Sequence, residues 1–239
     1  MQSTNKELKG KFIEIGSHEG QPFKGYLSMP ATQTGPCIVL IQEIFGVNSH
    51  IRRIADDYAN DGYFVLAPDL FWRMKPGVEL GYDDTDMQVG LSYLAKFDAE
   101  KGLKDINTAV DFLRHVEGST GKVATMGFCL GGLMSYRAAA NLPVDAAVSY
   151  YGVTIEKHLN EAAQIKCPLL MHFAENDHLA PPPVLKEIEQ VLKPKANVEF
   201  CVYEGVGHGF NCDLRPSYDK GAAALALKRT RAFLQKSLG

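Results

Sequence analysis

The stretch that decides the fold is GFCLGG at 127–132, which follows the apolar run KVATMG and precedes a helical pattern ending near Asn141. A turn of the form G-x-nucleophile-x-G between a strand and a helix holds its central residue on a sharp bend, and the glycines let neighbouring backbone approach. The central residue here is Cys129, at a helix start where the helix dipole favours a thiolate. A cysteine buried only for packing is the alternative, and residues downstream help to decide.

Short apolar runs alternate with longer helical patterns on both sides of this turn. The run CIVLIQ at 37–42 is apolar throughout, which is typical of a strand buried on both faces. Together these patterns predict one domain over residues 1–239, with a mainly parallel central sheet and helices on both faces. Further strands are predicted at 23–29, 64–67, 122–127, 146–151, 168–174 and 198–203, and helices at 48–62, 87–97, 103–116, 130–141, 155–164, 183–192 and 218–238.

Two residues that suit a nucleophilic cysteine follow later strands. Asp177 comes after the strand predicted at 168–174, and His208 lies between two glycines after the next strand. Histidine exchanges protons near neutral pH, and a carboxylate fixes its tautomer and stabilises its charged form. The order Cys129, Asp177, His208 is the order of nucleophile, acid and base in the α/β-hydrolase fold, which we therefore predict. Glu175 is the alternative acid.

The loop after CIVLIQ carries residues expected to face the thiol. In this fold that loop and the residue after the nucleophile supply the two N–H groups of an oxyanion hole, here predicted to be Ile44 and Leu130. Glu43 would then lie close to Cys129 and would need a partner, because an unpaired buried carboxylate is unfavourable. The alternative for Glu43 is exposure to solvent or a capping role. The candidates for contact with substrate are Phe45, Trp72 and Tyr151.

The composition narrows the classes of function. The 239 residues are 46% hydrophobic and 22% charged, as in a folded globular chain, and the net charge of −3 comes without a basic run. We therefore expect no nucleic-acid or membrane partner, and the lack of an apolar segment in residues 1–12 predicts a cytoplasmic protein. The five cysteines form no CxxC pair and are expected to be free thiols. No metal site is predicted, because no HxxxH or HExxH pattern occurs and the histidines lie in distant segments.

Six segments together resemble the dienelactone hydrolase (carboxymethylenebutenolidase) family. They are QEIFGVN at 42–48, APDL at 67–70, GFCLGG at 127–132, SYYG at 149–152, ENDH at 175–178 and GHGF at 207–210. The resemblance spans nearly the whole chain. It implies a cofactor-free, monomeric hydrolase that opens a small lactone or ester through an acyl-cysteine intermediate. It also implies that Glu43 interacts with the thiol of Cys129 and helps to deprotonate it when substrate arrives.

One feature of that family is missing from the sequence. Its best-studied members hold a substrate carboxylate with two arginines, and an ungapped alignment puts Met87 and Cys212 at those positions. Arg73 and Arg215 lie nearby and are candidate substitutes, although pairing at the surface is the role expected of both. The resemblance therefore implies the reaction type and leaves the charge of the substrate open. A thioesterase or peptidase with the same triad is one alternative, and a redox-sensing or binding protein without turnover is another.

Overall fold

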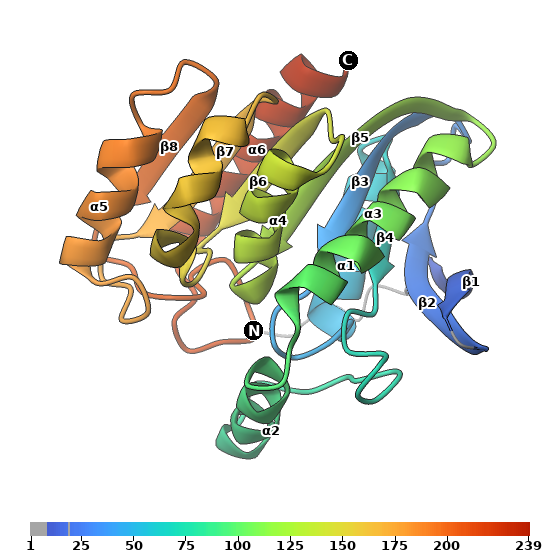
Figure 1. Cartoon of the computed structure of the whole chain (residues 1–239), viewed down its shortest axis with the longest axis horizontal. Helices are drawn as coiled ribbons and strands as arrows, with labels where there is room; N and C mark the ends of the chain where they lie inside the picture. The colour runs from blue at the N-terminus through green and yellow to red at the C-terminus, as the bar shows by residue number, and fades with distance from the viewer. Residues whose placement is uncertain (1–8, 19) are drawn as a thin grey trace.

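The computed structural model describes residues 9–18 and 20–239, and it shows a mostly parallel sheet between two layers of helices (Figure 1). The strand order is β1-β2-β4-β3-β5-β6-β7-β8, with β1 and β2 antiparallel to their neighbours and the rest parallel. This confirms the predicted fold class. The strands are β1 (Lys11–His18), β2 (Gln21–Ser28), β3 (Gly35–Ile41), β4 (Phe64–Pro68), β5 (Ser119–Phe128), β6 (Ala146–Tyr150), β7 (Leu169–Ala174) and β8 (Val198–Tyr203).

Helices cover both faces of the sheet. On one face lie α1 (Ser49–Asn60) and α6 (Lys220–Leu238), and on the other lie α3 (Ala99–His115), α4 (Leu130–Asn141) and α5 (Pro182–Leu192) (Figure 1). The helix α2 (Asp84–Leu94) projects beyond the carboxyl ends of the strands, at the lower edge of Figure 1. The carboxyl edge of the parallel strands is therefore bordered by α2 and by the loops that follow those strands.

The central strand β3 shows why its sequence is apolar at every position. Ile38 and Leu40 pack in the same cluster as α1 and α6, whereas Val39 and Ile41 pack in the cluster that contains α3. Successive side chains of a strand point to opposite faces, so a strand covered on both sides needs an apolar residue at each position. The loop after β3 is thereby fixed in the middle of the sheet.

Two elements differ in kind from the prediction, and the bounds of several others shift by three or four residues, as in α2 at Asp84–Leu94 against a predicted helix at 87–97. The strand β1 is not predicted, because it lies at the edge of the sheet and its sequence KFIEIGSH mixes polar and apolar residues. The segment Ile155–Gln164 is a 3-10 helix, η1, in which His158 has non-helical dihedral angles. The polar residues 1–8, which carry much of the expectation that no export signal is present, lie outside the described residues.

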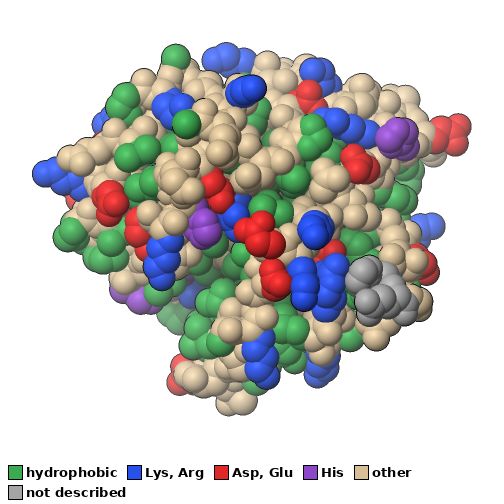
Figure 2. Space-filling model, in the orientation of Figure 1, with side chains coloured by type: hydrophobic (Ala, Val, Ile, Leu, Met, Phe, Trp, Pro, Cys, Tyr) green, Lys and Arg blue, Asp and Glu red, His purple; other side chains and the backbone are tan. Residues whose placement is uncertain are grey.

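The surface carries charges of both signs. On the face shown in Figure 2, Lys and Arg side chains lie interspersed with Asp and Glu side chains. Among the helices of residues 9–18 and 20–239, none is long and apolar enough to cross a membrane.

Candidate active site

Five loops that follow parallel strands meet at the carboxyl edge of the sheet. The chain passes from β3 to Glu43, from β5 to Cys129, from β6 to Tyr151, from β7 to Asp177 and from β8 to His208. Because parallel strands end at one edge, residues far apart in sequence come together there. All five side chains are buried.

Cys129 occupies a strained turn between β5 and α4. Its backbone has φ 55° and ψ −113°, which is unusual for a residue with a side chain. Its N–H donates to the carbonyl of Tyr150 (3.0 Å), and its own carbonyl accepts from the N–H groups of Leu133 (3.1 Å) and Val153 (3.3 Å). These bonds fix the bend against β6 and α4, which is the geometry expected of a nucleophile turn.

The glycines on either side of Cys129 make this turn possible. A Cβ atom on Gly127 would lie 2.2 Å from the carbonyl oxygen of Gly131, and one on Gly131 would lie 2.3 Å from the carbonyl oxygen of Ile41. Real Cβ atoms do not approach backbone oxygens so closely, so a larger residue at Gly127 would push β5 and α4 apart, and one at Gly131 would push α4 away from β3. The sequence pattern is therefore a packing requirement of the turn.

His208 and Asp177 form a buried hydrogen-bonded pair. Nδ1 of His208 lies 2.7 Å from Oδ2 of Asp177, and the other carboxylate oxygen accepts a hydrogen bond from the N–H of Leu179 (2.8 Å). Glu175, the alternative acid, instead accepts a hydrogen bond from the N–H of Gly205 (2.9 Å). Asp177 is therefore the carboxylate that contacts His208. Glu175 instead links the loop after β7 to the loop after β8.

The charges of Cys129, His208 and Asp177 are coupled. Burial would lower the pKa of His208, but the neighbouring Cys129 and Asp177 outweigh burial and raise this pKa to about 10. Burial would likewise raise the pKa of Asp177, and the hydrogen bond and positive charge of His208 hold it below its usual value. Nε2 of His208 makes no hydrogen bond to any described residue. Since Nδ1 is bound to Asp177, Nε2 is the nitrogen available for proton exchange.

Glu43 is buried, and its carboxylate faces two partners other than the thiol. Oε2 accepts a hydrogen bond from the hydroxyl of Tyr82 (3.1 Å), and Oε1 lies 3.4 Å from Nη1 of Arg215. No hydrogen bond joins Glu43 to Cys129 within the described part of the chain. A buried carboxylate is stabilised by a nearby cation and a donor. The contact between Glu43 and the thiol therefore stays a prediction.

Arg215 is the site residue whose place the sequence did not reveal. Its side chain is only 12% exposed, so the expectation that it pairs at the surface is wrong. Its guanidinium lies over the rings of Phe45 and Tyr82, 5.8 Å and 5.9 Å from their centroids. Burial would lower the pKa of Arg215, but its interactions with Glu43, Tyr151, Cys129 and Cys212 raise it. The guanidinium thus belongs to the same electrostatic environment as the thiol.

A fold-back of the chain after His208 brings Arg215 into the site. The N–H of Cys212 donates to the carbonyl of Gly209 (3.0 Å), and the N–H of Arg215 donates to the carbonyl of Cys212 (3.1 Å). Gly209 has φ 80°, and a Cβ atom there would lie 2.5 Å from Nη1 of Arg215. An ungapped alignment cannot show two successive turns. The only sequence signal for the fold-back is the glycine after His208.

The other expected site residues fall into two groups. Phe45 lies 4.5 Å from the ring of Tyr82, beside the Glu43–Arg215 pair, and Tyr151 lies 5.0 Å from the ring of His208. Phe45 and Tyr151 thus border the paired side chains of the site.

Trp72 and Arg73 instead form a separate cluster. Trp72 stacks on Phe23 and donates its Nε1–H to Asp105 (3.1 Å), and Arg73 pairs with the same carboxylate while lying over the indole ring. Neither makes a hydrogen bond, ion pair or ring contact with the triad residues among those described. Met87 is half-buried on α2 and packs in the cluster of α3.

The predicted oxyanion-hole residues occupy suitable positions in the chain. Leu130 is the first residue of α4, where a backbone N–H has no acceptor within the helix. Ile44 lies in the loop directly after β3 and packs against Gly90 of α2. Both N–H groups therefore belong to the backbone that surrounds Cys129.

Comparison with known proteins identifies the family. The model of the dienelactone hydrolase family matches residues 23–238. The carboxymethylenebutenolidase of Pseudomonas putida is 36% identical over 223 residues, which cover 93% of this chain and 94% of that protein. Carboxymethylenebutenolidase 1 of Cupriavidus pinatubonensis is 32% identical over 223 residues, covering 93% and 95%. A crystal structure assigned as a dienelactone hydrolase of Klebsiella pneumoniae has a TM-score of 0.84 at 27% identity, covering 95% of this chain and 98% of that one. The chain therefore belongs to the dienelactone hydrolase family.

Proposed function

We propose that this protein hydrolyses a small ester or lactone through an acyl-cysteine intermediate on Cys129. The observation that carries the proposal is the buried hydrogen bond between His208 and Asp177, next to a cysteine held on a strained turn at a helix start. The paired histidine can exchange a proton with a cysteine so placed and thereby activate it as a nucleophile. Family membership and the relatives named carboxymethylenebutenolidase support hydrolysis of an ester or lactone.

The proposed reaction has two halves. In the first, the thiolate of Cys129 attacks the carbonyl carbon, and the N–H groups of Ile44 and Leu130 stabilise the oxyanion. The C–O bond then breaks, and Nε2–H of His208 protonates the leaving oxygen, which stays attached to the acyl group when the substrate is a lactone. In the second half, His208 takes a proton from water, which attacks the thioester and releases the carboxylic acid and the thiolate. Asp177 keeps the imidazole in the required orientation.

Arg215 gives this site a means of recognising an anionic substrate. Its guanidinium is largely buried beside Glu43, and the neighbouring Cys129 is one of the groups that raise its pKa. A substrate carboxylate would compete with Glu43 for Arg215, because arginine forms charge-assisted hydrogen bonds to carboxylates. Glu43, once released, would then be able to accept the proton of the thiol. On this proposal Arg215 supplies one of the two cations that the ungapped alignment fails to find.

The test is the release of p-nitrophenol from p-nitrophenyl acetate. Wild-type protein is expected to show a burst followed by steady turnover, because acylation and deacylation are separate steps. Cys129→Ala is expected to lose turnover on the order of 10⁴-fold or more. Cys201→Ser is the matched control, since Cys201 is a free, half-buried cysteine in β8 that the proposal does not use. Turnover close to wild type in folded Cys129→Ala protein would refute the proposed nucleophile.

A further inference from the structure

Tyr82 reaches the proposed active site from the segment between β4 and α2. The N–H of Leu80 donates to the carbonyl of Phe45 (2.9 Å), and Glu79 forms a β-bridge with Gly46, so this segment runs beside the loop that follows β3. The ring of Tyr82 also packs on the ring of Phe45, with their centroids 4.5 Å apart. The phenol is therefore fixed to the loop that carries the glutamate of the site.

The side chain of Asn48 decides where the Tyr82 hydroxyl directs its proton. Oδ1 of Asn48 caps α1 by accepting from the N–H of Ile51 (3.2 Å), so the amide nitrogen faces the other way. Nδ2 donates to the carbonyl of Leu80 (3.0 Å) and to the hydroxyl of Tyr82 (3.2 Å). An amide nitrogen only donates, so the hydroxyl accepts from it and donates its one proton to Oε2 of Glu43 (3.1 Å). The hydrogen bond from Tyr82 to Glu43 therefore has a fixed direction.

The hydroxyl of Tyr82 stays protonated beside this carboxylate. Burial, together with the negative charge of Glu43, raises the pKa of Tyr82 well above its usual value. At neutral pH the phenol therefore acts on Glu43 as a hydrogen-bond donor, and not as a charge or a base.

Each oxygen of the Glu43 carboxylate has its own anchor. Oε2 accepts from Tyr82, and Oε1 lies 3.4 Å from Nη1 of Arg215. The contact with Arg215 is longer than the distance of about 2.8 Å that is usual between a guanidinium and a carboxylate. A substrate carboxylate that takes Arg215 removes only one of the two anchors. Tyr82 therefore limits how far Glu43 is released.

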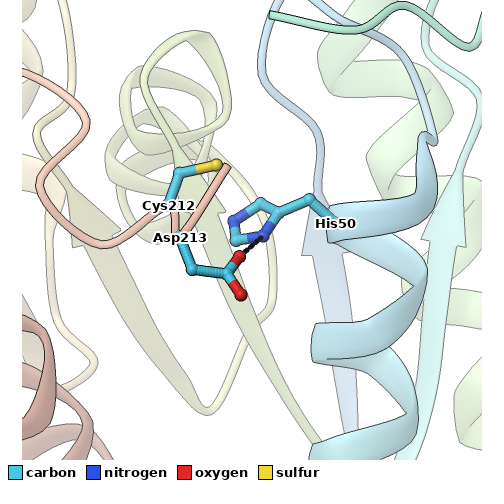
Figure 3. Close-up of side chains that lie close together, drawn as sticks. All are labelled: His50, Cys212 and Asp213. Atoms are coloured by element: carbon cyan, nitrogen blue, oxygen red, sulfur yellow. Dashed lines mark ion pairs between the residues drawn. The ribbon is translucent and has the colours of Figure 1, made fainter. Parts of the chain in front are cut away.

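Both anchors have contacts to the start of α1 that do not involve the glutamate. Asn48 caps this helix and donates to Tyr82. The segment that carries Arg215 is joined to the same helix through Asp213, whose Oδ1 lies 3.5 Å from Nδ1 of His50 (Figure 3). The resting position of the carboxylate is thus set by its surroundings.

We propose that Tyr82 is a positioning residue that holds Glu43 away from the thiol of Cys129 in the resting protein. This rests on the proposed function, in which a released Glu43 accepts the proton of the thiol. Without the hydroxyl of Tyr82, Glu43 keeps one anchor instead of two and turns toward the thiol more often. The proton then passes from the sulfur to the carboxylate, and the thiolate that forms is the species that reacts with alkylating agents.

The test is the rate at which iodoacetamide labels Cys129 without substrate, measured by peptide mapping because four other cysteines are also free. Tyr82→Phe removes the hydroxyl and keeps the ring. We expect it to speed labelling at least about fivefold, since the loss of a hydrogen bond to a charged group corresponds to roughly tenfold. Tyr93→Phe is the matched control and should leave the rate unchanged, because Tyr93 is a half-buried tyrosine of α2 whose ring packs on Phe71.

A double-mutant cycle shows whether Tyr82 acts through the carboxylate. Glu43→Gln removes the group that accepts the thiol proton, so this variant is expected to label more slowly than wild type. Tyr82→Phe combined with Glu43→Gln is expected to label at the rate of Glu43→Gln alone, because the hydroxyl then has no carboxylate to restrain.

Three results would overturn the proposal. They are labelling of Tyr82→Phe no faster than wild type, labelling of Glu43→Gln faster than wild type, and an equal gain from Tyr82→Phe with and without Glu43. The last would show that Tyr82 only supports the packing of the site. If the double variant does not fold, the rate of Tyr82→Phe against wild type decides. Labelling needs no turnover, so a failure of the proposed hydrolysis, seen as absent p-nitrophenol release, remains distinguishable from a failure of this proposal.

Discussion

At the scale of single residues, the charged groups of the site are buried in pairs. Glu43 lies with Arg215, and Asp177 lies with His208. A buried charge is tolerated when an opposite charge and hydrogen bonds replace its lost water, and removing one partner leaves the other unfavourably buried. Each pair thus places a proposed functional residue beside a partner of the opposite charge type.

Arg215→Met should lower kcat/KM more for an anionic substrate than for a neutral one. The change removes the guanidinium and keeps an unbranched apolar side chain, so a carboxylate-bearing lactone loses a charge-assisted contact that its neutral analogue never makes. We expect kcat/KM to fall about 10–100-fold more for the anionic lactone than for the neutral one, the range that corresponds to one hydrogen bond to a charged group.

The control for this comparison is Arg73→Met, because Arg73 pairs with Asp105 in a separate cluster. That variant should leave the ratio of the two kcat/KM values unchanged. Equal losses on both lactones in Arg215→Met would show that Arg215 only supports the fold around Glu43.

Asp177→Asn should slow the reaction far more than Glu175→Gln. The amide keeps the shape of Asp177 but stabilises the wrong tautomer of His208, a change that lowers kcat about 10⁴-fold in a serine triad. Glu175 is exposed and bonds the N–H of Gly205, so its loss should leave kcat within about threefold of wild type. The measurement is steady-state kinetics on one ester, and the reverse order of the two effects would reassign the acid.

Much of the proposed site is predictable from the sequence, and the reason is local. Cys129, Asp177 and His208 each follow a strand that can be recognised by its apolar run, and parallel strands bring their carboxyl ends together. Arg215 is not predictable in this way. It enters the site through two turns, and the space for its guanidinium depends on the missing side chain of Gly209.

At the scale of elements, β7 carries a histidine that is buried in its neutral form. Nδ1 of His172 lies 2.8 Å from the hydroxyl of Tyr203 and Nε2 lies 3.0 Å from the hydroxyl of Thr230, so the ring joins β7 to β8 and α6. Burial, with a smaller contribution from the positive charge of Arg229, lowers the pKa of His172 to about 3.

This histidine makes the fold sensitive to acid. Its pKa is 6.5 in the ordinary case and about 3 in the folded chain, so between these values the unfolded chain binds a proton that the folded chain does not. The free energy of unfolding therefore falls as the pH falls, by about 2 kcal/mol between pH 7 and pH 5 from His172 alone.

Urea unfolding at pH 7 and pH 5 measures this effect in wild type and in His172→Gln. The glutamine does not titrate, so the variant should lose about 2 kcal/mol less than wild type over that interval, whatever its stability at pH 7. Equal losses in the two proteins would mean that other groups cause the acid sensitivity.

The elements show where sequence patterns are sufficient and where they are not. The bounds of α4 and β8 agree with the prediction, because a strained turn and a change of periodicity mark them. Ile155–Gln164 has a helical apolar pattern but forms a kinked 3-10 helix. Its shape is set by tertiary contacts that include a hydrogen bond from the hydroxyl of Tyr136 to the carbonyl of His158 (3.0 Å), which periodicity does not encode.

At the scale of the whole molecule, ion pairs of very different burial join the outer elements. Arg137 of α4 pairs with Glu161 of η1, and their side chains are 6% and 11% exposed. Arg231 of α6 pairs with Asp61 after α1, and these side chains are 48% and 29% exposed. The first pair fixes the helix that begins at the nucleophile, so its contribution is expected to exceed that of the second.

Arg137→Met should lower the free energy of unfolding by about 3–5 kcal/mol, because Glu161 is left buried without its cation. Arg231→Met should change it by less than about 1 kcal/mol, as is usual for an exposed pair. Chemical unfolding of the two variants under one set of conditions tests this, and similar losses would contradict the importance given to burial.

Cys129, His208 and Asp177 follow three different parallel strands, and the proposed function assigns them the formation of an acyl-cysteine intermediate. That intermediate is the central claim. Intact-protein mass spectrometry tests it after a rapid acid quench, with a p-nitrophenyl ester whose bulky acyl group slows deacylation. We expect a mass gain of one acyl group, located by peptide mapping on Cys129 and absent from Cys129→Ala. Continued turnover with no acyl group on Cys129, or with the acyl group on another residue, would contradict the account.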